Sequence, residues 1–282
     1  MDTLIAYENH LGQRMEFGGG SESLHYLEHG LRSYKWEHSD LDGKVARFSR
    51  GMAEASFPVG IAAPDGATGI ELRNAVAALV EPDVAAHSPG RLILGDWSLD
   101  CYVIGCDPTA YWMDDRFCEL DLTVLAERME WIRSVEYRFS PGAGSAGGVG
   151  GEFPFDFKWE FRRPRTSEAV SNPGIAPAPF LWRVYGPAQS PYMIAGGNTY
   201  RVDCTVPDGS RLEVDSRAKT IKLVHADGSE ESVFASRLRG SQGSGTYVFE
   251  PFAIGDTSIT WNGSYKWDLV LHDVRSSPGW LA

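Results

Sequence analysis

The sequence predicts a mainly β protein, and three of its features lead to that prediction. Glycine makes up 31 of the 282 residues, often in Asp-Gly, Asn-Gly and Gly-Gly clusters between short apolar segments. Such clusters are typical of the turns that connect antiparallel strands. Hydrophobic residues form 43% of the chain, enough for a folded core, and only one segment has a clear helical period. A chain of this length folds as one or two domains.

The N-terminal part is predicted to contain strands of a sandwich or barrel. Its apolar or alternating segments are short and are separated by Gly, Asp-Gly and Ser-Glu clusters, a pattern that favours strands. The predicted strands are 4–7, 15–17, 31–36, 45–48 and 55–59.

Residues 68–80 form the predicted helix. Apolar residues recur there at helical spacing, Thr68 can cap the first turn, and Pro82 ends the helix. The next segment, 91–104, contains two β-rich runs on either side of Gly95-Asp96. That arrangement indicates a hairpin.

The middle of the chain alternates and then becomes rich in glycine. Apolar residues alternate from Cys118 to Phe139, as strands require. The glycine-rich run at 140–152 is typical of a flexible loop or a domain junction. Residues 164–179 are rich in Pro and Ser.

The last third is predicted to form half-buried antiparallel strands. Leu212 and Val214 alternate with charged residues, a second apolar pair follows at 221 and 223, and Asp227-Gly228 turns the chain towards 233–234.

Near the C-terminus, Asn262-Gly263 separates two alternating apolar sets. Ile259 and Trp261 share one parity, and a second set after the turn, Tyr265, Trp267, Leu269 and Leu271, also shares one. A two-residue turn would place the two sets on opposite faces of a hairpin. We therefore expect a three-residue or bulged turn.

Charge and targeting signals narrow the class of protein. The chain has 26 Lys and Arg against 38 Asp and Glu, a net charge of −12, and its basic cluster is limited to Arg162, Arg163 and Arg165. This balance argues against nucleic-acid binding. The N-terminus has no pattern of a secretory signal, and no run of 18 apolar residues predicts a membrane span. The irregular cysteine spacing fits synthesis in a reducing compartment.

Motif chemistry predicts no catalytic, cofactor-binding or metal site. The G-x-G-x-x-G at 142–147 is followed by more glycine rather than a helix, so we interpret it as a loop.

Metal-ligand spacing is absent around the cysteines, and we expect Cys101 and Cys106 to be buried free thiols. The seven histidines contain no H-E-x-x-H, and there is no G-x-S-x-G elbow. The remaining candidates are an acidic patch, interpreted as a solvated face, and the histidines, interpreted as surface residues. These residues are Asp114, Asp115, Glu119 and Asp121, and His10, His25, His29, His38, His87, His225 and His272.

Five tryptophans raise one sharper hypothesis, because aromatic rings exposed on a β-sandwich can stack on sugars. We favour the alternative that they are core and interface residues. They are Trp159, Trp182, Trp261, Trp267 and Trp280.

The order of several short segments resembles the distal tail protein (Dit) family of siphophage and prophage tails. The N-terminal segments begin with Tyr7-Glu-Asn-His-Leu-Gly12, followed by the helix 68–80 and the hairpin from Pro89 to Val103. The C-terminal segments start at Phe153-Pro-Phe-Asp-Phe157 and continue with Asn172-Pro-Gly174, Ala178-Pro-Phe180, Tyr185-Gly-Pro-Ala188, Gly197-Asn-Thr-Tyr200, Val214-Asp-Ser-Arg-Ala-Lys-Thr220, Phe249-Glu-Pro251, Trp261-Asn-Gly-Ser264 and Trp280.

The resemblance implies two β-sandwich domains and a structural role. Residues 1–138 would be a ring-forming domain with the helix 68–80, and 139–282 a galectin-like domain. The protein would be a hexameric hub at the virion tail tip, made in the bacterial host cytoplasm, that joins the tail tube to the tip or baseplate in host adsorption. Its partners would be the tail tube protein, the tape-measure protein and a tail-associated lysin or tail fibre. No catalytic residue, cofactor or metal is implied. The lengths of 140–152 and 164–179 depart from the family pattern.

Two other functions stay open at this point. A carbohydrate-binding module would show a solvent-facing row of tryptophans, and the outer domain could contact a host cell-wall glycan. A β-sandwich glycoside hydrolase would need a carboxylate pair about 5–10 Å apart in a cleft.

Overall fold

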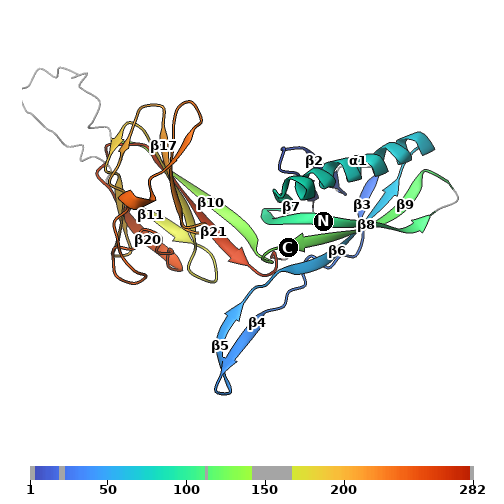
Figure 1. Cartoon of the computed structure of the whole chain (residues 1–282), viewed down its shortest axis with the longest axis horizontal. Helices are drawn as coiled ribbons and strands as arrows, with labels where there is room; N and C mark the ends of the chain where they lie inside the picture. The colour runs from blue at the N-terminus through green and yellow to red at the C-terminus, as the bar shows by residue number, and fades with distance from the viewer. Residues whose placement is uncertain (1–3, 19–22, 112–113, 142–166, 280–282) are drawn as a thin grey trace, which may run out of the picture. The chain divides into compact units, whose positions relative to one another are not determined.

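The computed structural model describes residues 4–18, 23–111, 114–141 and 167–279, and it is mainly β, as predicted (Figure 1). The chain forms two compact units. Unit 1 contains Met1–Arg133 and Val274–Ala282, and unit 2 contains Ser134–Asp273. The chain passes from one unit to the other inside two strands, β10 (Trp131–Phe139) and β21 (Trp267–Arg275). Within the described ranges, no helix has the length and hydropathy of a membrane span.

Unit 1 contains two antiparallel sheets that share one long strand. The strand orders are β2-β1-β7-β8 and β3-β6-β9-β8. The bounds are β1 (Ile5–Glu8), β2 (Arg14–Phe17), β3 (Leu24–Tyr26), β6 (Ala53–Ala62), β7 (Gly90–Leu94), β8 (Trp97–Tyr111) and β9 (Phe117–Ala126). Because β8 belongs to both sheets, their inner faces enclose one core.

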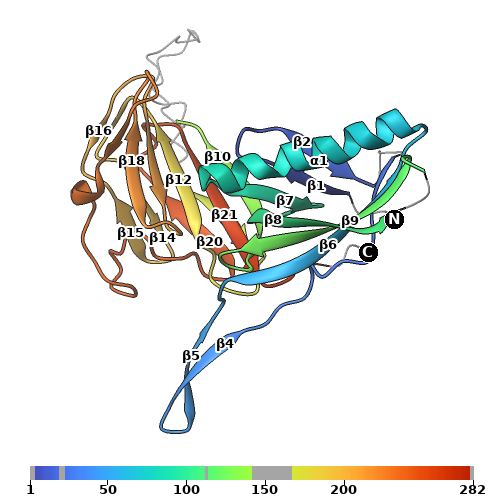
Figure 2. The same cartoon turned by 45° about the vertical axis from the view of Figure 1, so that its right-hand side comes forward.

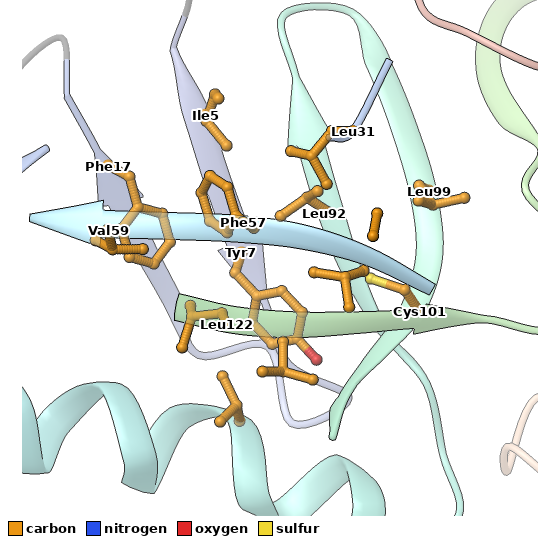
Figure 3. Packing of buried hydrophobic residues seen from close by; sticks show 14 of the residues in the cluster. Ile5, Tyr7, Phe17, Leu31, Phe57, Val59, Leu92, Leu99, Cys101 and Leu122 are labelled. Atoms are coloured by element: carbon orange, nitrogen blue, oxygen red, sulfur yellow. The ribbon is translucent and has the colours of Figure 1, made fainter. Parts of the chain in front are cut away.

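Alternation along the strands builds this core. In β9 every second residue is buried, which is the pattern of a strand with one face on a core. Phe17 and Phe57 meet edge to face with ring centroids 5.2 Å apart. Figure 3 shows them beside Tyr7, Val59 and Leu122, which come from different strands.

The helix is longer than the predicted 68–80. It is α1 (Gly66–Ala86), and its N-cap is Asp65 rather than Thr68. The Asp65 carboxylate accepts hydrogen bonds from the Thr68 N–H and hydroxyl, at 2.8 and 3.0 Å, so Thr68 belongs to the first turn.

Pro82 lies inside α1 instead of ending it. Tertiary contacts hold the last turn in place despite the donor that proline lacks. The Asn9 side chain donates to the Leu79 carbonyl at 3.1 Å, and the buried Asp83 carboxylate is bound by Tyr7 and His10. The helix ends at Ala86, and its C-cap residue His87 has a left-handed φ of 52°.

Most of the other N-terminal predictions are confirmed. The hairpin about Gly95-Asp96 is present, with Leu94 paired to Trp97 and Gly95 at a φ of +60°. The predicted strands overlap β1, β2, β5 (Lys44–Ser49) and β6.

The predicted strand 31–36 is wrong. Leu31 is buried, but its neighbours satisfy their backbone groups outside a ladder. The Gly30 N–H donates to the Ser56 carbonyl, and the Trp131 indole N–H donates to the Leu31 carbonyl. The apolar residues therefore anchor an irregular segment.

Unit 2 is a β-sandwich. One sheet has the order β19-β18-β17-β12-β21-β10, the other has β11-β20-β14-β15, and β13 pairs with β16. The bounds are β11 (Ser167–Asn172), β12 (Phe180–Tyr185), β13 (Ala188–Gln189), β14 (Tyr192–Ala195), β15 (Asn198–Arg201), β16 (Thr205–Val206), β17 (Arg211–Asp215), β18 (Thr220–Val224), β19 (Glu230–Ser232) and β20 (Gly255–Thr260). Both sheets contribute residues to one buried cluster.

The bulged turn predicted at Asn262-Gly263 is wrong, because β20 and β21 do not form a hairpin. They belong to opposite sheets of the sandwich. Trp261, the residue that follows β20, and Trp267, the first residue of β21, reach the same core, with ring centroids 5.5 Å apart. Both apolar sets can therefore face the same core, because the chain crosses from one sheet to the other between β20 and β21.

The last predicted strand is also displaced. The turn at Asp227-Gly228 is present, but it leads into β19 at 230–232, and Phe234 begins the 3-10 helix η1 (Phe234–Ser236). The Ser236 N–H donates to the Val233 carbonyl at 3.0 Å, so the chain turns there instead of extending the sheet.

Candidate interaction surfaces

A hairpin in unit 1 projects from the end of β6 (Figure 1). It consists of β4 (Glu37–Leu41) and β5, joined by Asp42-Gly43, and nearly every residue in it is exposed. Three of its apolar residues, Leu41, Val45 and Phe48, are 69%, 54% and 62% exposed. An isolated two-stranded hairpin is marginally stable in water. The hairpin therefore presents apolar side chains on both faces that the described residues do not cover.

The two faces of the hairpin differ in chemistry. Arg47 pairs with Ser39 and Lys44 pairs with Leu41. Residues 39 and 41 point to the same side of β4, so Arg47 and Lys44 share one face with Leu41. Val45 and Phe48 pair with Asp40 and His38 on the other face.

Arg50 fixes the base of the hairpin. Its guanidinium lies 4.5 Å from the centroid of the exposed Trp36 ring. Its Nη1 is 3.5 Å from Glu130 Oε1, and its Nε donates to Ser276 Oγ at 3.1 Å. The Arg50 side chain thus links the base of the hairpin to Glu130, the residue before β10, and to Ser276 in the C-terminal segment of unit 1.

We expect Arg50→Ala to loosen the hairpin without unfolding unit 1. Losing one cation–π contact and two polar contacts costs about 1–2 kcal/mol. Hydrogen exchange measured by mass spectrometry should therefore speed up several-fold over 37–49. Arg14→Ala, which removes an exposed pair with Glu16, is the matched control. Unchanged exchange over 37–49 in Arg50→Ala would show that Arg50 does not hold the hairpin.

The outer face of α1 is a second exposed surface of unit 1. As far as Glu81, the exposed residues of α1 recur at helical spacing and form one stripe about 100° wide. They are Ala67, Ile70, Glu71, Asn74, Ala78 and Glu81. Neither glutamate forms an ion pair with the described residues.

Under α1, a buried carboxylate ties the helix to β1. Asp83 is fully buried and accepts from Tyr7 Oη at 2.5 Å and from the His10 backbone N–H at 2.9 Å. The His10 ring Nδ1 lies 2.5 Å from the same carboxylate. Burial, and then the bond to Asp83, raise the pKa of the Tyr7 hydroxyl, which keeps its proton for donation. A Cβ at Gly90 would collide with both Tyr7 and Asp83.

Three of the five tryptophans considered for sugar stacking lie in the core of unit 2. Trp182, Trp261 and Trp267 are at most 3% exposed, so they offer no face to a sugar. Trp159 and Trp280 lie outside the described residues, as do the G-x-G-x-x-G at 142–147, the 153–157 loop and the three arginines at 162, 163 and 165.

The cysteines have different environments. Cys101 is buried, and that burial raises the pKa of its thiol to about 12. Cys106 is exposed, contrary to the prediction of a buried thiol. The register of β8 shifts after Val103, and the strand is largely exposed from Ile104 onward, so the burial of Cys101 does not extend to Cys106. Within the described ranges, no group of three His, Cys, Asp or Glu residues could hold a metal ion.

The acidic patch contains local pairs. Asp114 lies 2.6 Å from the Arg116 guanidinium, and the pKa of the Asp114 carboxyl is lowered by its hydrogen bond to that side chain. Asp115 lies 3.9 Å from Arg73, and Asp121 accepts from Ser56 Oγ at 2.6 Å. The histidine pair 25 and 29 does not lie on a helix, since His25 is in β3 and His29 follows it.

Together these surfaces define a two-unit β protein with a projecting arm, whose exposed features suit contacts between proteins. No protein-family model and no curated protein matches the sequence. Solved structures match it along its whole length. The Dit protein of phage SPP1, described as a paradigm of the hub adsorption apparatus in phages that infect Gram-positive bacteria, has a TM-score of 0.59 and 12% identity, covering 98% of this chain and 100% of that one.

Two structures of the phage P2 baseplate in its activated conformation are similar to the chain as well. The one with Ca has a TM-score of 0.56 at 8% identity, and the one with Sr has 0.57 at 9%. Each alignment covers 98% of this chain and 99% of the other. At these identities the shared property is the fold, and the chain has the fold of a Dit-type hub protein.

Proposed function

We propose that this chain is a structural subunit of a phage or prophage tail, a hub that joins the tail tube to the tail tip or baseplate. The observation that carries the proposal is the likeness to the SPP1 Dit hub protein, which spans both units and leaves almost no part of either chain unmatched. A likeness confined to one sandwich would support only a common β fold.

Unit 1 supplies the contacts between copies in this proposal. Its hairpin exposes apolar residues that the described part of its own chain does not cover. A closed ring of about six copies would cover every hairpin at once, because each copy presents the same two surfaces to its neighbours. The ring-forming domain expected at 1–138 would lie mainly in unit 1 and the outer domain expected at 139–282 mainly in unit 2, except that Val274–Ala282 belongs to unit 1.

The outer domain would serve as a docking platform at the virion tail tip. Partners of the ring would be the tail tube protein and the tape-measure protein, with a tail-associated lysin or fibre on the other side. The edge strand β19 exposes Glu230, Glu231 and Ser232, and charged edges resist unspecific strand pairing.

A structural role without catalysis agrees with how two of the buried carboxylates are used. Asp83 accepts from Tyr7, and Asp268 accepts from Tyr185 Oη at 2.6 Å. Each carboxylate thus binds a side chain of its own unit, as an element of structure does. The buried tryptophans of unit 2 favour this function over a carbohydrate-binding module.

The proposal is tested by the mass of the full chain in solution. Light scattering over a concentration series should show a species of about six protomers, and negative-stain images of it should show rings. A strict monomer, both alone and when mixed with a tail tube protein, would contradict a self-assembling hub.

A further inference from the structure

We infer that the basic face of the β4–β5 hairpin in one copy docks on the outer face of α1 in the next copy. The inference rests on the proposed self-assembly and names the two surfaces that make the contact. The hairpin contributes Leu41, Lys44 and Arg47, and the helix contributes Ile70, Glu71 and Glu81.

The charges of the two surfaces are opposite and available. Lys44 and Arg47 are exposed, and neither forms an ion pair with the described residues, although the chain as a whole carries a net charge of −12. Glu71 and Glu81 are the charged members of the α1 stripe, and they are exposed as well. Complementary charges steer association and set the register of an interface.

The apolar parts of the two surfaces also match. Leu41 lies directly opposite Lys44 on the same face of the hairpin as both cations, and it is 69% exposed. Ile70 is 44% exposed on the helix, and the small side chain of Ala67, one turn before it, leaves room for a close approach. Lys44 and Arg47 lie about 10 Å apart along a strand. Glu71 and Glu81 lie about 15 Å apart along a helix, a difference that these long side chains can span.

The placement of the surfaces fits a ring. Figure 1 and Figure 2 both show the hairpin leaving unit 1 on the side opposite to α1. Two different surfaces on opposite sides of a subunit make a head-to-tail contact. Such contacts form a ring when the rotation from each subunit to the next adds up to a full turn. A hairpin on the same side as its target would favour a two-fold dimer instead.

Charge reversal with rescue tests the contact. The hairpin variant is Lys44→Glu with Arg47→Glu, and the helix variant is Glu71→Lys with Glu81→Lys. Each variant alone sets like charges against each other, and we expect its ring fraction to fall about tenfold or more at equal concentration. Mixed in equal amounts, the two variants should restore rings, because every contact in an alternating ring then joins opposite charges.

The controls separate this inference from the proposed function. Arg128→Glu with Arg239→Glu makes the same charge change at exposed positions elsewhere and should leave assembly intact. Circular dichroism should show that all variants keep their fold. If the unmodified chain forms rings but the reversed variants also do, or if mixing does not restore them, the hairpin–helix contact is wrong while the hub remains. If the unmodified chain never assembles, it is the proposed function that fails.

Discussion

Trp267→Ala should unfold unit 2 while leaving unit 1 folded. The Trp267 side chain is fully buried and stacks on Phe139 with ring centroids 3.9 Å apart. It also meets Trp182 and Trp261 edge to face, at 6.3 and 5.5 Å. Because these rings come from both sheets, the truncation opens a cavity where the sandwich is held together. Such a change costs about 3–5 kcal/mol.

Scanning calorimetry with hydrogen exchange assigned to each unit would measure this effect. Trp267→Phe should lower the free energy of unfolding of unit 2 much less than Trp267→Ala, because phenylalanine keeps most of the ring volume. In addition, the Trp267 indole N–H is buried with no hydrogen-bond partner among the described residues, so its removal costs nothing in pairing. Ile254→Ala, at an exposed site of the same unit, is the matched control. Equal stability of Trp267→Ala and the control would contradict the proposed role of Trp267 in the core.

Asp83→Ala should have the second large effect, on unit 1. The substitution leaves the Tyr7 hydroxyl and the His10 N–H without their acceptor below the helix. Removing one partner of a buried polar network costs about 3–5 kcal/mol, because the remaining groups stay desolvated. The last turn of α1, which contains Pro82, depends on the same contacts and should exchange its amides faster.

A graded series separates the network from simple loss of volume. Asp83→Asn keeps one acceptor oxygen and should lose less than the alanine variant. Tyr7→Phe removes a single donor and should cost about 1–2 kcal/mol. Glu81→Ala, on the exposed stripe of the same helix, should change the free energy of unfolding by less than about 0.5 kcal/mol. An alanine variant as stable as Glu81→Ala would show that the buried carboxylate does not hold α1.

Local signals in the sequence predict several elements of the fold correctly. The two-residue hairpin at Gly95-Asp96 needs a positive φ at its first turn residue, and glycine supplies it. The existence of α1 follows from its spacing. The first and last residues of α1 could not be predicted in this way. Asp65 competes with Thr68 as the N-cap, and Pro82 is tolerated inside the helix because contacts of Asn9 and Asp83 hold the last turn.

The candidate surfaces could be predicted only in part. The alternation at 45–48 indicates a strand, but the same pattern occurs in strands that bury one face. Exposure of Val45 and Phe48 follows from the isolation of the hairpin from both sheets of unit 1. The α1 stripe likewise becomes a candidate surface only when it is known which side of the helix rests on β6 and β8.

Local patterns were enough to predict the secondary-structure class, the Gly95-Asp96 and Asp227-Gly228 turns and the resemblance to a tail hub, because these depend on neighbours a few residues apart or on the order of short segments. Which strands pair became known from the three-dimensional structure alone. Trp261 and Trp267 illustrate the reason: their parities conflict in one sheet, yet both residues face one core when the strands belong to opposite sheets. Pairing depends on contacts between distant residues, and local periodicity carries no information about them.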